Sequence, residues 1–224
     1  MTVAAYLPTP VPTPPPAGAA VAELKKGKAL KPPYLPQRHN YTPTHPDLFR
    51  IEFGPEGEEF GSSLRAEKAY KKGDILCPIR NTLPGIKAYS SVQVLPDPPL
   101  PSSSSSDYPS TYFDSAPSST RRHIELNSDL LYVNHSCDPN VVFDVEGHRS
   151  MTASASRSPL PSPQILTFAY FSTEWDMDQP FHCLCGTDRC IKTIQGAKDL
   201  DTKVLDSYFI NRHIRAMKEH QQRS

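Results

Sequence analysis

The spacing of apolar residues along the chain predicts several short strands separated by turns. Phe49, Ile51 and Phe53 alternate with polar residues at the period of two that characterises a half-buried strand. Two later runs are rich in β-branched and aromatic residues, which favour extended backbone. Together these patterns place strands at residues 49–53, 75–76, 141–145 and 165–170.

The last part of the chain follows the helical period instead. From Asp199 to Gln221 apolar residues recur at the spacing of one helical stripe, at Leu200, Val204, Leu205, Tyr208, Phe209, Ile214 and Met217. Charged residues occupy most of the positions between them. The pattern predicts a single amphipathic helix that packs its apolar stripe on the domain.

Proline interrupts these patterns in three places. The chain has 25 prolines in 224 residues, and they gather in residues 7–46, in residues 96–117 beside a serine tract, and around Pro161. None of these stretches has the apolar periodicity that would offset the entropy lost on ordering. We therefore expect them to be extended or disordered.

Charge and cysteine content narrow the classes of protein that remain. Lys and Arg number 24, as do Asp and Glu, so net charge gives no general attraction to nucleic acid or anionic membranes. No apolar run approaches the roughly 20 residues of a spanning helix, and the N-terminus lacks the pattern of a secretory signal. We expect an intracellular protein, in cytoplasm or nucleus, with no membrane or direct nucleic-acid partner.

A cysteine cluster indicates a metal site. Cys183, Cys185 and Cys190 form a C-x-C-x4-C arrangement, and three thiols this close suit a tetrahedral zinc ion. A closed structural site needs a fourth ligand, for which Cys137 is the best candidate and His135 and His182 are substitutes. The total of five cysteines is odd, which argues against complete disulfide pairing. The fifth, Cys77, lies in a strand-like stretch and is expected to be an ordinary core residue.

Four short motifs occur in an order typical of one enzyme family. Residues 132–140 read Tyr-Val-Asn-His-Ser-Cys-Asp-Pro-Asn, residues 166–170 read Leu-Thr-Phe-Ala-Tyr, and residues 61–66 read Gly-Ser-Ser-Leu-Arg-Ala. With the cysteine cluster they resemble the motifs F/Y-x-N-H-S-C-x-P-N, L-T-F-x-Y, G-x-G-L-x-A and the post-SET C-x-C-x4-C of SET-domain protein methyltransferases. The stretch 170–181 is similar to small fungal members in particular.

The resemblance implies a mostly β fold with some α structure. It would consist of short curved sheets with a pseudo-knot, a four-cysteine zinc post-SET tail and the C-terminal amphipathic helix. It also suggests boundaries, which we place as a proline-rich disordered leader at 1–47, a SET domain at 48–178 with a low-complexity insert at about 96–120 and a second loop at about 147–163, a post-SET zinc segment at 179–197, and a C-terminal helix at 198–224.

The resemblance also implies roles for individual residues. Tyr170 would carry the catalytic hydroxyl, and S-adenosylmethionine would be bound by Gly61, Ser63, Leu64, Asn134, His135 and Leu184. Tyr132, Phe168 and Phe181 would line the substrate channel. Zinc would be held by Cys137, Cys183, Cys185 and Cys190. The expected partner is a protein or peptide that presents a lysine, and the enzyme is expected to be a monomer.

The chemistry of lysine methylation agrees with these roles. Methyl transfer to an amine is an in-line displacement, in which the protein supplies alignment and a dry channel. The target lysine must lose its proton, and an apolar channel helps by lowering its free pKa of about 10.4. We therefore expect an S-adenosylmethionine-dependent protein-lysine N-methyltransferase.

Several residues depart from the family pattern. Ser63 replaces the second glycine of G-x-G, and Ala169 stands where an aspartate is usual. The alternative hypothesis is therefore a zinc-stabilised SET-fold binding protein with little or no activity. A zinc-dependent nucleic-acid module is weaker, because the sequence has no basic, aromatic-rich patch.

Overall fold

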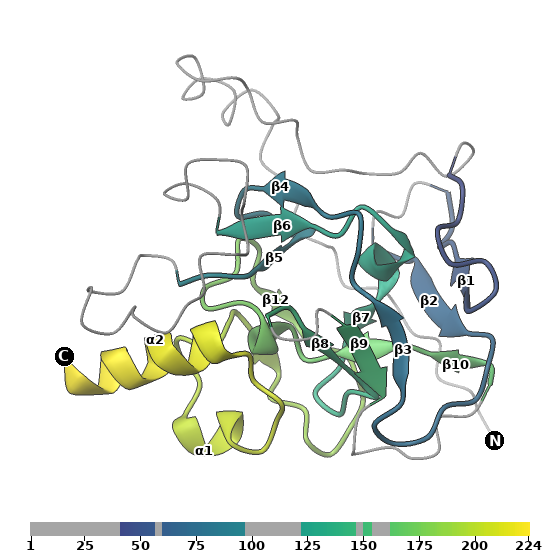
Figure 1. Ribbon diagram of the computed structural model, residues 1–224. Helices are drawn as coiled ribbons and strands as arrows, with labels where there is room; N and C mark the ends of the chain where they lie inside the picture. The colour runs from purple at the N-terminus through teal and green to yellow at the C-terminus, as the bar shows by residue number, and fades with distance from the viewer. Residues whose placement is uncertain (1–40, 57–59, 97–121, 147–149, 154–161) are drawn as a thin grey trace, which may run out of the picture. The chain divides into compact units, whose positions relative to one another are not determined.

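The computed structural model describes residues 41–56, 60–96, 122–146, 150–153 and 162–224 (Figure 1). All described residues belong to one compact unit, Pro32–Ser224. Residues 1–40 of the predicted leader, and all but one residue of the predicted insert, lie outside the described residues.

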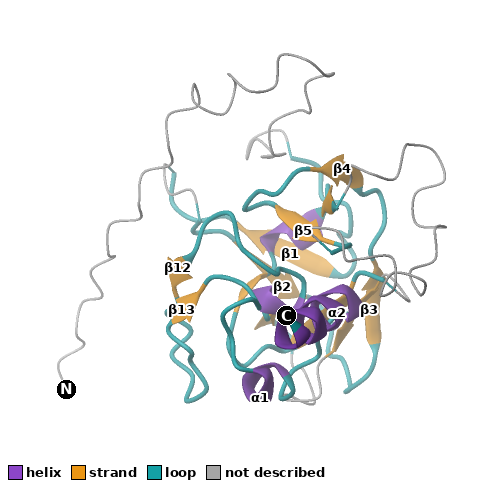
Figure 2. Cartoon of the chain, turned by 90° about the vertical axis from the view of Figure 1, so that its left-hand side faces the viewer, coloured by secondary structure: helices purple, strands orange, loops and turns teal. Residues whose placement is uncertain are grey.

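The described strands are short and form small sheets of two or three strands. One sheet has the order β1-β2-β10, a second β3-β9-β8 and a third β4-β6-β5, while β7 pairs with β11 and β12 pairs with β13. Their bounds are β1 Phe49–Glu52, β2 Ser63–Ala66, β3 Ile75–Pro78, β4 Leu83–Gly85, β5 Ser91–Gln93, β6 His123–Glu125, β7 Asn134–His135, β8 Val141–Asp144, β9 Ser150–Ala153, β10 Gln164–Ile165, β11 Thr167–Phe168, β12 Phe181–His182 and β13 Thr193–Ile194. Loops and turns make up much of the trace between them (Figure 2). The prediction of a mostly β fold of short sheets is confirmed.

The predicted strand at 165–170 is divided in the structure. β10 pairs antiparallel with β2, whereas β11 pairs parallel with β7. Between them, Leu166 donates its N–H to Leu64 O, and Thr167 donates its N–H to the Asn140 side chain. Tyr170 then begins a 3-10 turn, η4, at Tyr170–Ser172. The composition of residues 165–170 predicts one continuous strand, but the segment is divided because its two parts pair with different strands, β2 and β7.

The predicted loop at 147–163 also differs from the structure. It contains β9, which pairs antiparallel with both β3 and β8. Met151, in the middle of this strand, is fully buried. Its serine and threonine neighbours hid the strand from composition-based analysis, and pairing on both edges supplies the order that local sequence does not.

A C-terminal amphipathic helix is present as predicted, but it begins at Arg212 rather than near residue 199, and a short separate helix precedes it. The two helices are α1, Thr202–Leu205, and α2, Arg212–Arg223. Asn211 at the break has extended backbone, and its amide donates to Phe143 O at 2.8 Å and Ser172 O at 2.9 Å while accepting from Val145 N at 3.0 Å. These long-range bonds hold the backbone outside the helical region, although the apolar spacing continues through it.

The predicted disordered leader ends too late in the chain. Residues 41–47 are ordered against Asp129, which is fully buried in a 3-10 turn, η3, at Asp129–Tyr132. The carboxylate of Asp129 accepts hydrogen bonds from Tyr41 OH at 2.5 Å, Thr44 N at 2.9 Å and His45 N at 2.7 Å. In return, Thr44 Oγ1 accepts from Asp129 N at 3.0 Å. We call residues 41–48 the docked segment.

The apolar core formed by the described residues has three parts. The largest lies between the sheets and includes the stacked rings of Phe143 and Phe168, and Cys77 is buried within it as predicted. A second joins α1 and α2 to η4 through residues such as Phe171, Trp175 and Ile214. The third surrounds the cysteines. Tyr170 on η4 and His135 on β7 lie beside the third cluster, so the predicted site residues gather where these elements meet the cysteine segment.

Candidate functional site

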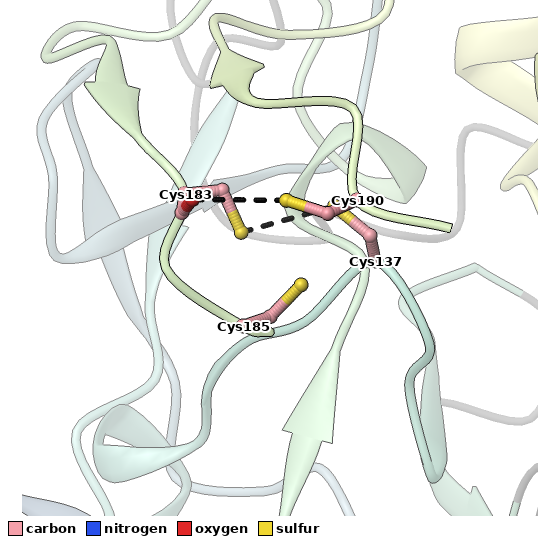
Figure 3. A group of neighbouring side chains, drawn as sticks. All are labelled: Cys137, Cys183, Cys185 and Cys190. Carbon is pink, nitrogen blue, oxygen red and sulfur yellow. Dashed lines mark hydrogen bonds between the residues drawn. The ribbon is translucent and has the colours of Figure 1, made fainter. Parts of the chain in front are cut away.

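The structure brings the four predicted cysteine ligands together. Cys137 follows β7, and Cys183, Cys185 and Cys190 lie between β12 and β13; all four Sγ atoms lie within 4.8 Å of one another (Figure 3). The Sγ atoms of Cys137 and Cys183 are 3.8 Å apart. Zn–S bonds of about 2.3 Å in a tetrahedron place sulfurs about 3.8 Å apart, so the donor set fits zinc. Neither His135 nor His182 belongs to this group.

Local backbone geometry directs the thiols inward. Gly186 has a φ of +67°, a conformation that glycine adopts without strain, and it turns the chain between Cys185 and Cys190. Ile191 donates its N–H to Cys137 Sγ at 3.4 Å. Burial raises the pKa of Cys185, but hydrogen bonds from Thr187 and from neighbouring cysteines outweigh it and lower the pKa to about 6. A metal ion would supply the positive charge that the remaining thiolates need.

His135 connects the cysteine cluster to Tyr170. Its Nε2 lies 3.4 Å from Cys137 Sγ, and its Nδ1 accepts a hydrogen bond from Tyr170 N at 3.2 Å. Burial lowers the pKa of His135 to about 4, so the ring is neutral at physiological pH. The side chain is thus committed to protein contacts, which leaves its backbone as the group able to meet a ligand.

Asn134 is committed in a similar way. Its amide donates to Ser62 O at 2.9 Å, which ties β7 to the loop that contains Gly61. Gly54 packs closely against that loop, because a Cβ added to Gly54 would lie 2.7 Å from Gly61 Cα. Sequence analysis did not single out Gly54 for this role. The signal was present as a glycine in the loop after the first strand.

The other predicted cofactor residues are placed as follows. Ser63 pairs with Glu52 in the β1–β2 ladder, where the backbone is extended. Serine adopts extended backbone without strain, so this position does not require the conformational freedom of glycine. Leu64 is fully buried, and only its backbone can meet a ligand. Leu184 is 56% exposed and lies beside the cysteines.

Tyr170 lies among aromatic rings with its hydroxyl held by backbone. The hydroxyl donates to Val133 O at 3.3 Å. Its ring centroid is 4.8 Å from that of Phe168, 5.2 Å from that of His135 and 6.1 Å from that of Phe181. Burial raises the pKa of Tyr170, so the phenol stays protonated. The rings of Phe168 and Phe181 therefore both lie close to that of Tyr170, and Phe168 lines the same cleft as Tyr170.

Tyr132 occupies a different place. Its ring packs edge-on against Tyr41 at 5.7 Å and Phe53 at 5.6 Å. It is not part of the lining of the small cleft that reaches Tyr170, among the residues that the structure describes. The placement of Tyr132 supports packing of the docked segment rather than a channel wall.

A cleft of about 50 Å³ opens beside Tyr170. Its walls come from β5 and the turn before it, from the η3 region, and from the end of β11 and the residues that follow it. Phe168, Tyr170 and Glu174 lie together on the last of these walls, and Leu130 and Val133 lie on the second. Sequence analysis missed Glu174, which stood in the Ser-Thr-Glu-Trp-Asp-Met run but carried no motif signal of its own.

Comparisons with known proteins agree with this arrangement. A SET domain family model matches residues 61–170. The methyltransferase flvH of Aspergillus flavus is 34% identical over 175 residues, which cover 77% of this chain and 82% of that protein. Histone-lysine N-methyltransferases, H3 lysine-4 specific, of Aspergillus oryzae and Emericella nidulans are 36% identical over 63 residues, or 26% of this chain and 5% of theirs.

These findings support a methyltransferase. Among the described helices, none has the length and apolar character needed to cross a membrane. The similarity to flvH extends over most of both chains and includes the region that the family model matches. The chain therefore belongs to the SET-domain family.

Proposed function

We propose that the protein is an S-adenosylmethionine-dependent protein-lysine N-methyltransferase whose active site is completed by a structural zinc ion. The observation that carries the proposal is the placement of Tyr170. Tyr170 lines the cleft, its backbone N–H donates to His135 Nδ1, and His135 Nε2 lies near Cys137 Sγ in the cysteine cluster. One short path of contacts thus joins the proposed catalytic hydroxyl to the proposed metal centre.

The backbone around β7 is the proposed place for the methyl donor. Asn134 and His135 would contact it through main-chain groups, because their side chains are engaged within the protein. Gly61, Ser63 and Leu64 would approach it from the neighbouring loop, and exposed Leu184 would cover it. Bound S-adenosylmethionine would supply the electrophilic methyl group.

The chain's own residues would bind and orient the acceptor amine. The hydroxyl of Tyr170 remains a neutral hydrogen-bonding group, and its position is fixed by Val133 O. Phe168 presents an apolar ring beside it, and desolvation by such a wall lowers the pKa of a lysine amine. Alignment of this kind is worth orders of magnitude in rate, because a 1 Å misplacement costs roughly a hundredfold.

The proposed zinc ion would order the segment that carries Leu184 and Phe181. This segment is short, and its core contains little beyond the cysteines, Ile194 and their partly buried neighbours. Metal binding would therefore contribute directly to its folding. The four thiols would form a closed site, which is typical of a structural rather than a catalytic zinc.

Methyl incorporation from labelled S-adenosylmethionine tests the proposal. Wild-type protein should label a protein pool that includes histone H3, and Tyr170→Phe should lose most of the rate while retaining zinc and thermal stability. Tyr70→Phe is the matched control, because Tyr70 is another buried tyrosine and its hydroxyl has no hydrogen-bond partner among the described residues.

Two outcomes would contradict the proposal. Equal rates for Tyr170→Phe and wild type would remove Tyr170 from the chemistry. Cofactor binding without methyl transfer to any protein would favour the zinc-stabilised binding protein instead.

A further inference from the structure

Glu174 is a buried acidic residue in the wall of the cleft that contains Tyr170. It lies two residues after the end of η4, and its N–H donates to Tyr170 O at 3.0 Å. The residue is only 8% exposed, and it lines the cleft together with Phe168 and Tyr170. Burying an acidic side chain is costly, so its position in this wall calls for a physical reason.

The carboxylate is held in place by two strands. Its Oε1 accepts from Gln93 N on β5 at 2.7 Å, and its Oε2 lies 3.7 Å from His123 Nε2 on β6. In return, Gln93 Oε1 accepts from Trp175 N at 2.9 Å. These reciprocal bonds fix the carboxylate relative to Tyr170. This structural role requires a hydrogen-bond acceptor at the position of Oε1 but does not require a charge.

The charge of the cleft points to a role beyond this structural one. Glu174 and exposed Asp178 are acidic, and no lysine, arginine or histidine is among the residues that line it. Lys87, in the turn before β5, instead forms an ion pair with Asp176 at 2.6 Å. The remaining lining is apolar, hydroxylic or amide. The residues that line the cleft therefore include two acidic side chains and no basic one.

We propose that Glu174 is a specificity-determining residue, whose carboxylate favours a cationic amine over a neutral group of the same length in the cleft beside Tyr170. This inference rests on the proposed function, and it assigns substrate selection to a residue outside the family's motifs. A charge held in an apolar wall interacts more strongly with a ligand charge than one in water does. The Glu174 carboxylate would favour the lysine side chain of a substrate when that side chain first enters the cleft as an ammonium ion. The amine would lose its proton to solvent afterwards.

The ionisation of Glu174 is coupled to this role. Burial raises its pKa to about 7, while bonds from Gln93 and Thr173 and the charge of Lys87 act in the opposite direction. His123 on β6, Asp178 and the neutral phenol of Tyr170 are the other titratable groups that face or neighbour it. A cation in the cleft favours the ionised carboxylate, so binding should be stronger above this pKa than below it.

The proposal is tested by comparing the affinities of the protein for n-butylammonium and for 1-butanol. Binding is monitored through the methyl NMR signals of the cleft residues Leu126, Leu130 and Val133. Wild-type protein should prefer the cation by about tenfold, and Glu174→Gln should abolish most of that preference. Glutamine keeps an acceptor for Gln93 N, so the structural tie survives. Asp206→Asn removes an equal charge from an exposed ion pair and should leave the preference unchanged.

A second measurement uses wild-type protein alone. Between about pH 8.5 and about pH 5.5 n-butylammonium stays charged while Glu174 becomes protonated, so the preference should fall. An undiminished preference in Glu174→Gln, or one that is constant across this range, would overturn the proposal. Because neither readout requires methyl transfer, an inactive enzyme would count against the proposed function and not against this one.

Discussion

Replacing Asp129 with alanine should release the docked segment and destabilise the domain. Asp129 is fully buried, and its carboxylate accepts hydrogen bonds from Tyr41 OH, Thr44 N and His45 N. Alanine leaves these three donors without their acceptor. The ring contact between Tyr41 and Tyr132 depends on the same anchor.

The magnitude follows from the bonds and from what offsets them. Hydrogen bonds to a charged group contribute about 1.5–3 kcal/mol each, so three of them set a ceiling of several kcal/mol. Removal of Asp129 also relieves the desolvation of its own charge, and the released segment can hydrate its donors. We therefore expect a loss of about 3 kcal/mol in the free energy of unfolding, which corresponds to a fall in Tm of roughly 6–12 °C.

Calorimetry with limited proteolysis measures both effects. Asp129→Ala should lower Tm and make the peptide bonds of residues 41–48 susceptible to cleavage. Tyr41→Phe removes a single hydroxyl and should cost about 1 kcal/mol, while exposed Asp206→Asn should change stability by less than about 0.5 kcal/mol. If Asp129→Ala lowered Tm by less than about 2 °C and left the segment resistant, the anchor would not be stabilising the fold.

Three further predictions concern other parts of the molecule. Purified protein should contain about one zinc per chain, and Cys190→Ser should lose it by metal analysis, whereas Cys77→Ser should retain it. Asn211→Ala removes the acceptor of Val145 N and the side-chain donor to Phe143 O and Ser172 O at the break between α1 and α2, although Ser172 O keeps its bond from the backbone N–H of residue 211. Urea unfolding should therefore show a loss of about 2–4 kcal/mol, and an unchanged midpoint would contradict this. The pKa of Glu174 is raised from 4.5 to about 7, so its stabilising effect is complete below about pH 4.5 and lost as pH rises through about 7. Stability of wild type relative to Glu174→Gln should therefore fall by at most about 3 kcal/mol over that window, and parallel curves would contradict it.

Local sequence predicted the features that depend on neighbouring residues. The C-x-C-x4-C spacing indicated a metal site, and Gly186 supplies the turn that the spacing requires. The alternation at Phe49, Ile51 and Phe53 corresponds to β1. The fourth thiol, Cys137, was selected from its turn-like context, and it lies with the other three.

Features that depend on distant partners were missed. Apolar spacing continues through Asn211, and only its bonds to Phe143 and Ser172 reveal the break between helices. Asp129 belongs to no motif, and its hydrogen-bond partners lie more than eighty positions away in the chain. The role of Glu174 at the cleft likewise depends on Gln93, 81 positions earlier in the chain. Such contacts leave no periodic or motif signal in a single sequence.

Identification of the methylated residue tests the central claim most directly. Zinc-loaded wild-type protein should be incubated with S-adenosylmethionine and a protein pool, and the products examined by tandem mass spectrometry. Methyl groups should appear on lysine side chains of the pool and be absent when Tyr170→Phe replaces wild type. Methylation confined to another type of residue or to a non-protein acceptor, or equal lysine methylation by Tyr170→Phe, would contradict the account.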